Sequence, residues 1–365
     1  MPSPSAAPLD AEPFNAKQFD EQPFDEQPLD EQPVDGREKD WDGVRLHVVT
    51  GKGGTGKSTV AAALALALAS GGQRVLLAEV EDRQGIAQMF DVPPLGYEER
   101  RVAGAPGGGE VFGLAVEPKA ALLEYLQLFY KLGRAGGVLE RFGAIDFATT
   151  IAPGVRDVLL TGKVYEAVRR RADGRPVYDA VVLDAPPTGR VNRFLDVNTE
   201  VAGIARVGPI RNQADSITAL LHSPQTVVHL VTLLEEMPVQ ETLDGVQTLR
   251  GNGLPVGGIV VNLVDEPVLP DVDATTGADL DAPGLDAAQV AAGLAAAGLP
   301  HTDDDVRALL AEAREHGQRV RLQQRERLEI DALDRPVYEL PAVPQGVDVG
   351  TLYALAELLQ DQGMA

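Results

Sequence analysis

Short apolar runs alternate with longer amphipathic stretches from about residue 45 to the end of the chain. The runs are rich in Val, Leu and Ile and lack strict alternation with polar residues, which is typical of strands buried on both faces of a parallel sheet. They predict strands at 45–50, 75–80, 111–116, 179–184, 226–232, 256–262 and 336–340.

Helical periodicity fills the intervals between these runs. It predicts helices at 57–70, 119–132, 155–171, 239–251, 286–297, 303–333 and 348–360. Strands that alternate with helices in this way form a doubly wound α/β domain with a mostly parallel sheet. Two stretches, about 118–172 and 190–223, carry more helix than a simple crossover needs, and we interpret them as helical insertions.

Two acidic segments interrupt the pattern. Residues 1–42 contain near-copies of Phe-Asp-Glu-Gln-Pro with a period of five, and they carry twelve acidic and three basic residues. Regular prolines remove backbone donors and the charge opposes collapse, so we expect a disordered tail, with a docking motif built on the periodic Phe and Leu as the alternative. Residues 265–286 are acidic and rich in Pro, Gly and Ala, which indicates a flexible surface linker. The folded domain is therefore expected at 43–365.

Composition restricts the chemistry that the chain can perform. It has no cysteine, which excludes disulfides, iron–sulfur clusters, thiolate zinc sites and cysteine nucleophiles. A formal net charge of −23 disfavours nonspecific binding to nucleic acid or to anionic lipid. No apolar run reaches the roughly 18 residues of a membrane span, and no signal pattern precedes the domain, so we expect a cytoplasmic protein without an integral membrane segment.

A phosphate-binding loop stands between the first predicted strand and the first predicted helix. Its glycines let backbone N–H groups converge on phosphate oxygens, and the positive end of the following helix points to the same place. The nucleotide-binding residues that this motif predicts are Gly51, Lys52, Gly53, Gly54, Thr55, Gly56, Lys57, Ser58 and Thr59.

Two lysines of this loop are assigned different roles. Lys57 is expected to reach the β- and γ-phosphates of ATP, and the Ser58 hydroxyl is expected to bind Mg²⁺. Lys52 occupies a position that the ordinary motif leaves unspecified, where a surface lysine near a turn is also common. The spacing Lys-Gly-Gly-x-Gly-Lys-Ser is nonetheless that of the deviant loop, in which the first lysine reaches a nucleotide across a dimer interface.

A second element follows the strand predicted at 179–184. The apolar run ends in Asp184, which would place a carboxylate beside Mg²⁺, through a water molecule. The segment Pro187, Thr188 and Gly189 comes next and forms a stiff turn that can present backbone N–H groups to the γ-phosphate. Asp184 and Ser58 are thus the predicted metal residues.

These motifs together resemble the ArsA/Get-type ATPases, which use the deviant-Walker P-loop fold. The similarity lies in the loop, in the segment from Asp184 to Leu195 and in Pro238–Thr242, and it extends discontinuously from about residue 44 to 360. The resemblance implies a Mg·ATP-dependent ATPase that works as a dimer, drawn together by ATP and released by hydrolysis.

The resemblance also assigns residues singly. Asn262 matches the strand-end asparagine that reads the adenine edge, and Pro341 lies in a segment similar to the adenine-side loop. Glu81 stands where the family has the aspartate that activates the attacking water. Since a displacement of about 1 Å in a positioned group can cost about 10²-fold in rate, catalytic turnover is less secure than binding.

Two functional hypotheses follow. The first is an ATPase whose dimer opens and closes to act on a protein partner. The second is an ATP-binding regulatory subunit with weak hydrolysis, completed by a related catalytic ATPase subunit. The cysteine-based arsenite and zinc sites of relatives cannot be transferred to a chain without cysteine, and the cargo is not identified.

Overall fold

The computed structural model describes residues 40–80, 84–121, 124, 153–196, 209–265, 287–344 and 346–365. Several predicted features lie outside these ranges. They are most of the predicted tail, the centre of the first helical insertion, almost all of the predicted linker, and Glu81. Residues 40–43 form a turn, where Tyr338 donates to Asp40 (2.6 Å) and the Trp41 indole donates to Tyr338 (2.9 Å). Among the described residues, no helix has both the length and the apolar character that crossing a membrane requires.

The centre of the molecule is an eight-stranded sheet in the order β10-β9-β8-β1-β7-β2-β4-β3. All pairings in it are parallel except that of β3 with β4. Seven strands coincide with the predicted ones, within two residues at each end: β1 Leu46–Gly51, β2 Arg74–Glu79, β4 Glu110–Ala115, β7 Ala180–Asp184, β8 Thr226–Thr232, β9 Val256–Val264 and β10 Val337–Pro341. The predicted doubly wound α/β class is confirmed.

Three strands were not predicted. The edge strand β3 (Arg100–Gly104) runs antiparallel, and β5 (Arg171–Ala172) pairs with β6 (Arg175–Pro176) in a separate two-residue ladder. Their charged and exposed residues lack the apolar run that marks the buried strands. β3 depends on its pairing with β4, whereas β5 and β6 form a local hairpin whose two-residue turn is Asp173-Gly174.

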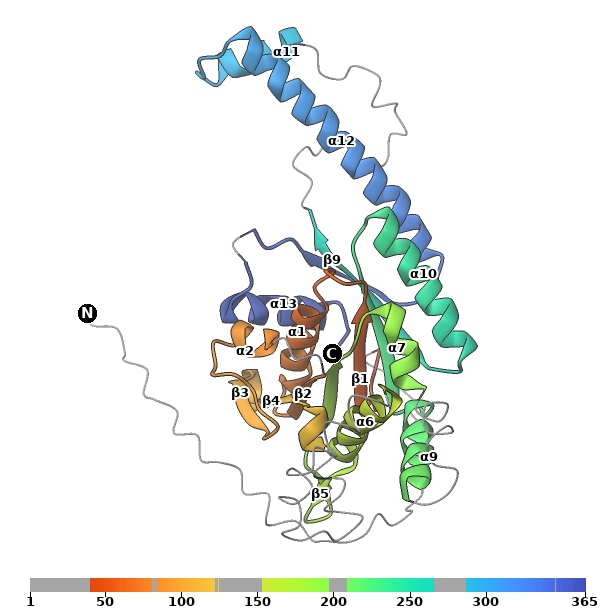
Figure 1. Cartoon of the computed structure of the whole chain (residues 1–365). Coiled ribbons are helices and arrows are strands. Elements are labelled where there is room, and N and C mark those ends of the chain that lie inside the picture. The colour runs from red at the N-terminus through yellow and green to blue at the C-terminus, as the bar shows by residue number, and fades with distance from the viewer. Residues whose placement is uncertain are drawn as a thin grey trace, which may run out of the picture.

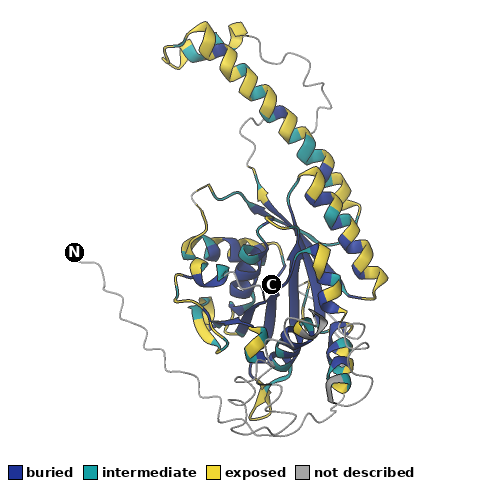
Figure 2. Ribbon diagram, in the orientation of Figure 1, coloured by how far each residue is buried: buried dark blue, intermediate teal, exposed yellow. Residues whose placement is uncertain are grey.

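Helices cover both faces of the sheet (Figure 1). One face is covered by α1 (Lys57–Ala69), α2 (Gly85–Met89) and α13 (Val349–Asp361). The other face is covered by α6 (Pro153–Arg169), α7 (Thr188–Leu195), α9 (Pro209–Leu221) and α10 (Glu236–Gly251). The central strands β1, β2, β7 and β8 are buried almost throughout (Figure 2). Two apolar clusters, one on each face, form the core.

A long helical arm projects away from this body. It consists of α12 (Asp303–Asp331) with α11 (Ala287–Ala296) against its tip, and most of its surface is exposed (Figures 1 and 2). Thr302 begins α12 with a capping box, accepting from the N–H of Asp305 while the Asp305 carboxylate accepts from the Thr302 N–H. The arm returns to the body near Ile330, which is fully buried.

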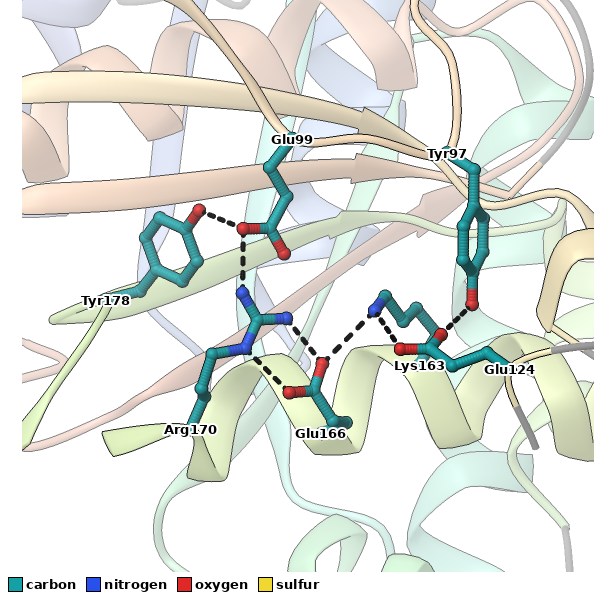
Figure 3. Close-up of polar contacts among 7 residues, drawn as sticks. All are labelled: Tyr97, Glu99, Glu124, Lys163, Glu166, Arg170 and Tyr178. Atoms are coloured by element: carbon teal, nitrogen blue, oxygen red, sulfur yellow. Dashed lines mark hydrogen bonds and ion pairs between the residues drawn. The ribbon is translucent and has the colours of Figure 1, made fainter. Parts of the chain in front are cut away.

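A half-buried network of charges anchors helix α6 to the edge of the sheet (Figure 3). Its members come from the segment before β3, the start of the first insertion, α6 with the residue after it, and the segment before β7: Tyr97, Glu99, Glu124, Lys163, Glu166, Arg170 and Tyr178. The Arg170 guanidinium lies between two carboxylates, 2.8 Å from Glu99 and 2.6 Å (Nε) from Glu166. Burial alone would lower the pKa of Arg170, but hydrogen bonds and charge from Glu166 and Glu99 outweigh it and raise that pKa.

The other members of the network pair with the carboxylates of Glu99, Glu124 and Glu166. Lys163 lies 2.9 Å from Glu124 and 3.3 Å from Glu166, and Tyr178 donates to Glu99 at 2.6 Å. Tyr97 donates to Glu124. Burial first, and then the neighbouring carboxylate charge, raises the pKa of both tyrosines, so both phenols stay protonated and donate. The network therefore connects the helical insertion to the edge of the sheet, and each side chain in it is paired with at least one other.

Two histidines are completely buried in the central strands. His47 Nδ1 lies 3.1 Å from His229 Nε2, and His229 Nδ1 accepts from the N–H of Gly258 at 3.2 Å. Because that acceptor nitrogen carries no proton, His229 Nε2 must hold one and donate it to His47. Both rings are consequently neutral. Burial lowers the pKa of His47 to about 4 and lowers that of His229 well below its ordinary value.

The histidine pair predicts a loss of stability in mild acid. The unfolded chain takes up protons near pH 6.5, whereas native His47 resists protonation down to about pH 4. The native state thus binds fewer protons in this window, and the free energy of unfolding should fall as the pH decreases through it. At about 1.4 kcal/mol per pKa unit, His47 alone accounts for about 3 kcal/mol. Urea unfolding from neutral pH to about pH 4 measures this slope.

A matched pair of variants isolates the histidine contribution from that of the carboxylates. His47→Gln should make the slope below pH 6.5 less steep, with His229 keeping its own contribution, while His222→Gln, at an exposed histidine, should leave the slope unchanged. An equal slope in wild type and His47→Gln would contradict the prediction.

Candidate nucleotide-binding site

The phosphate-binding loop leaves the end of β1, which is flanked by β7 and β8 in the middle of the sheet. Two of its glycines are required by close approach. A Cβ on Gly51 would stand 2.2 Å from the carbonyl oxygen of Val231 in β8. A Cβ on Gly56, whose φ is 85°, would stand 2.2 Å from Asn262 Nδ2. The loop is thus packed against residues of β8 and β9 and cannot accept side chains at these positions.

The predicted lysine and serine lie at the start of α1. Lys57 is 8% exposed, and its Nζ lies 3.4 Å from the carbonyl oxygen of Lys52, so the ammonium group is folded over the loop. Thr55 closes the loop from within by donating its hydroxyl to the same carbonyl at 2.9 Å. Thr59 turns away from the loop, and its hydroxyl faces the Met89 sulfur of α2 at 3.6 Å.

The two residues predicted to hold the metal are in contact. Ser58 Oγ donates to Asp184 Oδ2 at 2.5 Å, although 126 positions separate the two residues in the chain. Asp184 ends β7, where it lies beside Val49 of β1, and it is 7% exposed. The adjacency of β1 and β7 therefore brings the hydroxyl and the carboxylate together, as the motif analysis requires.

The turn after β7 is hydrogen-bonded to β1. Thr50 in β1 donates its hydroxyl to the carbonyl oxygen of Pro186 at 2.7 Å. Pro187 then caps α7, and Thr188 and Gly189 form its first turn. The turn is thereby held beside the loop, at the carboxyl edge of the sheet.

The predicted adenine-side residues lie at the same edge. Asn262 is buried near the end of β9, and its amide donates to the carbonyl oxygen of Thr55 at 2.9 Å. It thus supports the loop within its own chain, a role that sequence reasoning did not assign. Pro341 ends β10 beside Val264 of β9. The reading of adenine by either residue remains a prediction, and Glu81 lies outside the described residues.

One acidic residue at this site was missed by the motif analysis. Glu79 ends β2, is 4% exposed, and pairs in register with Asp184 of β7. Its Oε1 accepts from the N–H of Gly85 at 3.4 Å, at the start of α2. The available signal was a charged residue closing an otherwise apolar strand, the same signal that identified Asp184. Two buried carboxylates therefore end neighbouring strands here.

A second missed residue lies on α10. Glu241 places one carboxylate oxygen 3.1 Å from the Lys52 ammonium nitrogen and the other 3.4 Å from the hydroxyl of Thr188. Glu241 belongs to the Pro238–Thr242 segment already noted for its family resemblance, but its partners could not be deduced from spacing. The site thus contains an acidic side chain that forms an ion pair with a lysine of the loop.

Comparison with known proteins places this site in a family. The family model described as anion-transporting ATPase matches residues 44–221. ATPase BagA of Mycobacterium tuberculosis is 53% identical over 323 residues, 88% of this chain and 94% of that protein. The arsenical pump-driving ATPase of Escherichia coli is 27% identical over 242 residues, 62% of this chain and 40% of that protein. ATPase GET3 of Rhodotorula glutinis is 26% identical over 186 residues, 49% of this chain and 50% of that protein.

Proposed function

The chain belongs to the anion-transporting ATPase family, and on this basis we propose that it binds Mg·ATP and that ATP-dependent closure of a dimer drives the cycle of a protein partner. The observation that carries the proposal is the contact between Ser58 and Asp184 under the phosphate-binding loop. A serine at the end of such a loop and a carboxylate at the end of the neighbouring strand are the pair that P-loop ATPases use at the metal.

The donor set suits Mg²⁺. Ser58 and Asp184 provide hydroxyl and carboxylate oxygens, the ligands that a small hard cation prefers. Ser58 would hold the ion directly, and Asp184 would hold it through water. When bound, the ion would neutralise charge that develops on the phosphates. Lys57, which is nearly buried beside the loop, would supply a fixed positive charge at the same phosphates.

The exposed part of the loop supports a dimer. Lys52 is half-buried, while Gly53 and Gly54 after it are exposed, so this part of the loop can meet a facing subunit. A second subunit would place its nucleotide within reach of Lys52. The partner subunit is either a second copy of this chain or a related ATPase subunit, and the further protein partner is unidentified. The net charge of −23 argues against a nucleic acid partner.

The alternative function is a regulatory subunit that binds ATP but hydrolyses it weakly. It rests on Glu81, which replaces the family's catalytic aspartate with a longer side chain. In this case a related subunit would supply the catalytic carboxylate of a heterodimer. The two functions share the same nucleotide site and differ in the composition of the active dimer.

Light scattering after size-exclusion chromatography tests the proposal and separates it from the alternative. With Mg²⁺ and a non-hydrolysable ATP analogue, the chain alone is expected to change from the mass of one copy to that of two. Lys52→Met should prevent this change, and Lys119→Met, at an exposed lysine outside the loop, should not. A shift seen only when a related ATPase subunit is added would favour the heterodimer. No shift in either mixture would refute nucleotide-dependent closure.

A further inference from the structure

One carboxylate joins three neighbouring strand ends at the candidate site. Lys52 lies in the loop after β1, Thr188 follows β7, and Glu241 lies on the helix after β8. Because β8, β1 and β7 are adjacent in the sheet, these groups converge at its carboxyl edge. Glu241 contacts the other two with separate oxygens, at 3.1 Å from Lys52 and 3.4 Å from Thr188.

The packing of α10 explains why Glu241 is held at this place. Gly245 follows Glu241 by one helical turn, and a Cβ there would stand 3.0 Å from Leu230 of β8 and 3.5 Å from the Thr188 methyl group. Its lack of a side chain lets α10 approach β8 and the start of α7 closely. One turn earlier in the helix, Thr242 is 1% exposed, so this face of α10 is seated on the body. Glu241 is therefore carried by a well-packed helix rather than by a loop.

The Lys52–Glu241 pair is suited to exchange. The side chains are 29% and 38% exposed, so water screens their attraction and little is lost when they separate. An exposed ion pair of this kind shifts an equilibrium by about fivefold at most. A nucleoside triphosphate carries more negative charge than one carboxylate and accepts charge-assisted hydrogen bonds from lysine. Nucleotide phosphate can consequently compete with Glu241 for the Lys52 ammonium group.

We propose that Glu241 is a positioning residue that holds Lys52 within its own subunit and yields it to nucleotide phosphate. This inference rests on the proposed function, because it requires Lys52 to meet ATP. Glu241 then raises the ATP concentration at which the site closes, since closure must first break the pair. Because Glu241 also contacts Thr188, the turn after β7 takes part when the Lys52–Glu241 pair breaks.

The test is the half-saturating concentration of Mg·ATP, measured at equilibrium by calorimetry on the full chain. Glu241→Gln keeps the shape of the side chain, removes its charge, and is expected to lower this concentration about three- to fivefold. The matched control is Asp244→Asn, which removes one charge from the same helix. Asp244 is exposed and accepts from Gln240 at 2.9 Å. The control variant should bind as the wild type does.

A double-mutant cycle distinguishes positioning from a structural role. In a Lys52→Met background, Glu241→Gln should have no further effect, because the partner through which Glu241 acts is gone. Equal binding by Glu241→Gln and Asp244→Asn, weaker binding by Glu241→Gln, or the same gain without Lys52 would each overturn the inference.

A Lys57→Met variant separates this inference from the proposed function. If Lys57→Met binds Mg·ATP as tightly as the wild type, both the proposed function and the inference fail. If Lys57→Met weakens binding and Glu241→Gln has no effect, the inference alone fails.

Discussion

Replacing Lys57 by Met is expected to lower kcat/KM for Mg·ATP hydrolysis by about 10²–10³-fold, the usual cost of removing one preorganised charge from a transition state. Methionine fills most of the volume of the lysine stem, which matters because Lys57 is only 8% exposed. The fold should survive, and the loss should come from the missing ammonium group. Phosphate release at saturating and subsaturating ATP gives kcat and KM separately.

The control for this experiment is Lys119→Met, an exposed lysine outside the loop. It should hydrolyse ATP at the wild-type rate. Circular dichroism and the urea midpoint of Lys57→Met should match those of the wild type. Hydrolysis by Lys57→Met at the wild-type rate would mean that the measured activity does not arise at this loop.

Arg170→Met is expected to reduce the free energy of unfolding by about 3–5 kcal/mol, because its removal leaves the nearly buried carboxylate of Glu99 without a counter-charge. Glu99 is 7% exposed and Glu166 is 26% exposed, and both would lose their contact with the guanidinium group (Figure 3). Lys163 would still contact Glu166, so Glu99 should contribute most of the loss. Urea unfolding at neutral pH measures the change.

Two further variants define the cause of that loss. Arg156→Met removes an exposed arginine from α6, the helix that Arg170 directly follows, and should stay within about 0.5 kcal/mol of the wild type. Arg170→Lys retains the charge but not the planar fork that meets two carboxylates, so it should recover only part of the stability. A loss below about 1 kcal/mol in Arg170→Met would show that the network contributes no more than a surface ion pair.

The parallel strands were predictable because their sequences are apolar on both faces. β7 and β8 each contain four buried apolar residues in a row or nearly so, β1 contains three, and short runs of this kind bounded by turns are typical of strands in a sheet covered on both faces. The edge strand β3 was missed because Arg100 and Arg101 face solvent and its pairing depends on β4. The position of a strand in the sheet likewise follows from packing and not from its own residues.

The candidate site divides in the same way. The loop from Gly51 to Ser58 and the strand-terminal Asp184 were identified from local motifs, since their chemistry is encoded in neighbouring residues. Glu79 carried the same local signal as Asp184, an acidic residue that closes an apolar strand, but it was missed. Glu241 had no such signal, because its role depends on what the fold places beside it. Asn262 was identified, but its contact with the carbonyl oxygen of Thr55 was not.

The sequence alone determined the alternation of strands and helices, the phosphate-binding loop, the absence of cysteine chemistry and the membership of an ATPase class. These properties depend on residues close together in the chain or on composition. The tertiary structure decided which strands are neighbours, and therefore that Ser58 meets Asp184 and that Lys52 meets Glu241. Such contacts join residues more than a hundred positions apart, and they are set by the order of strands in the sheet, which no local pattern encodes.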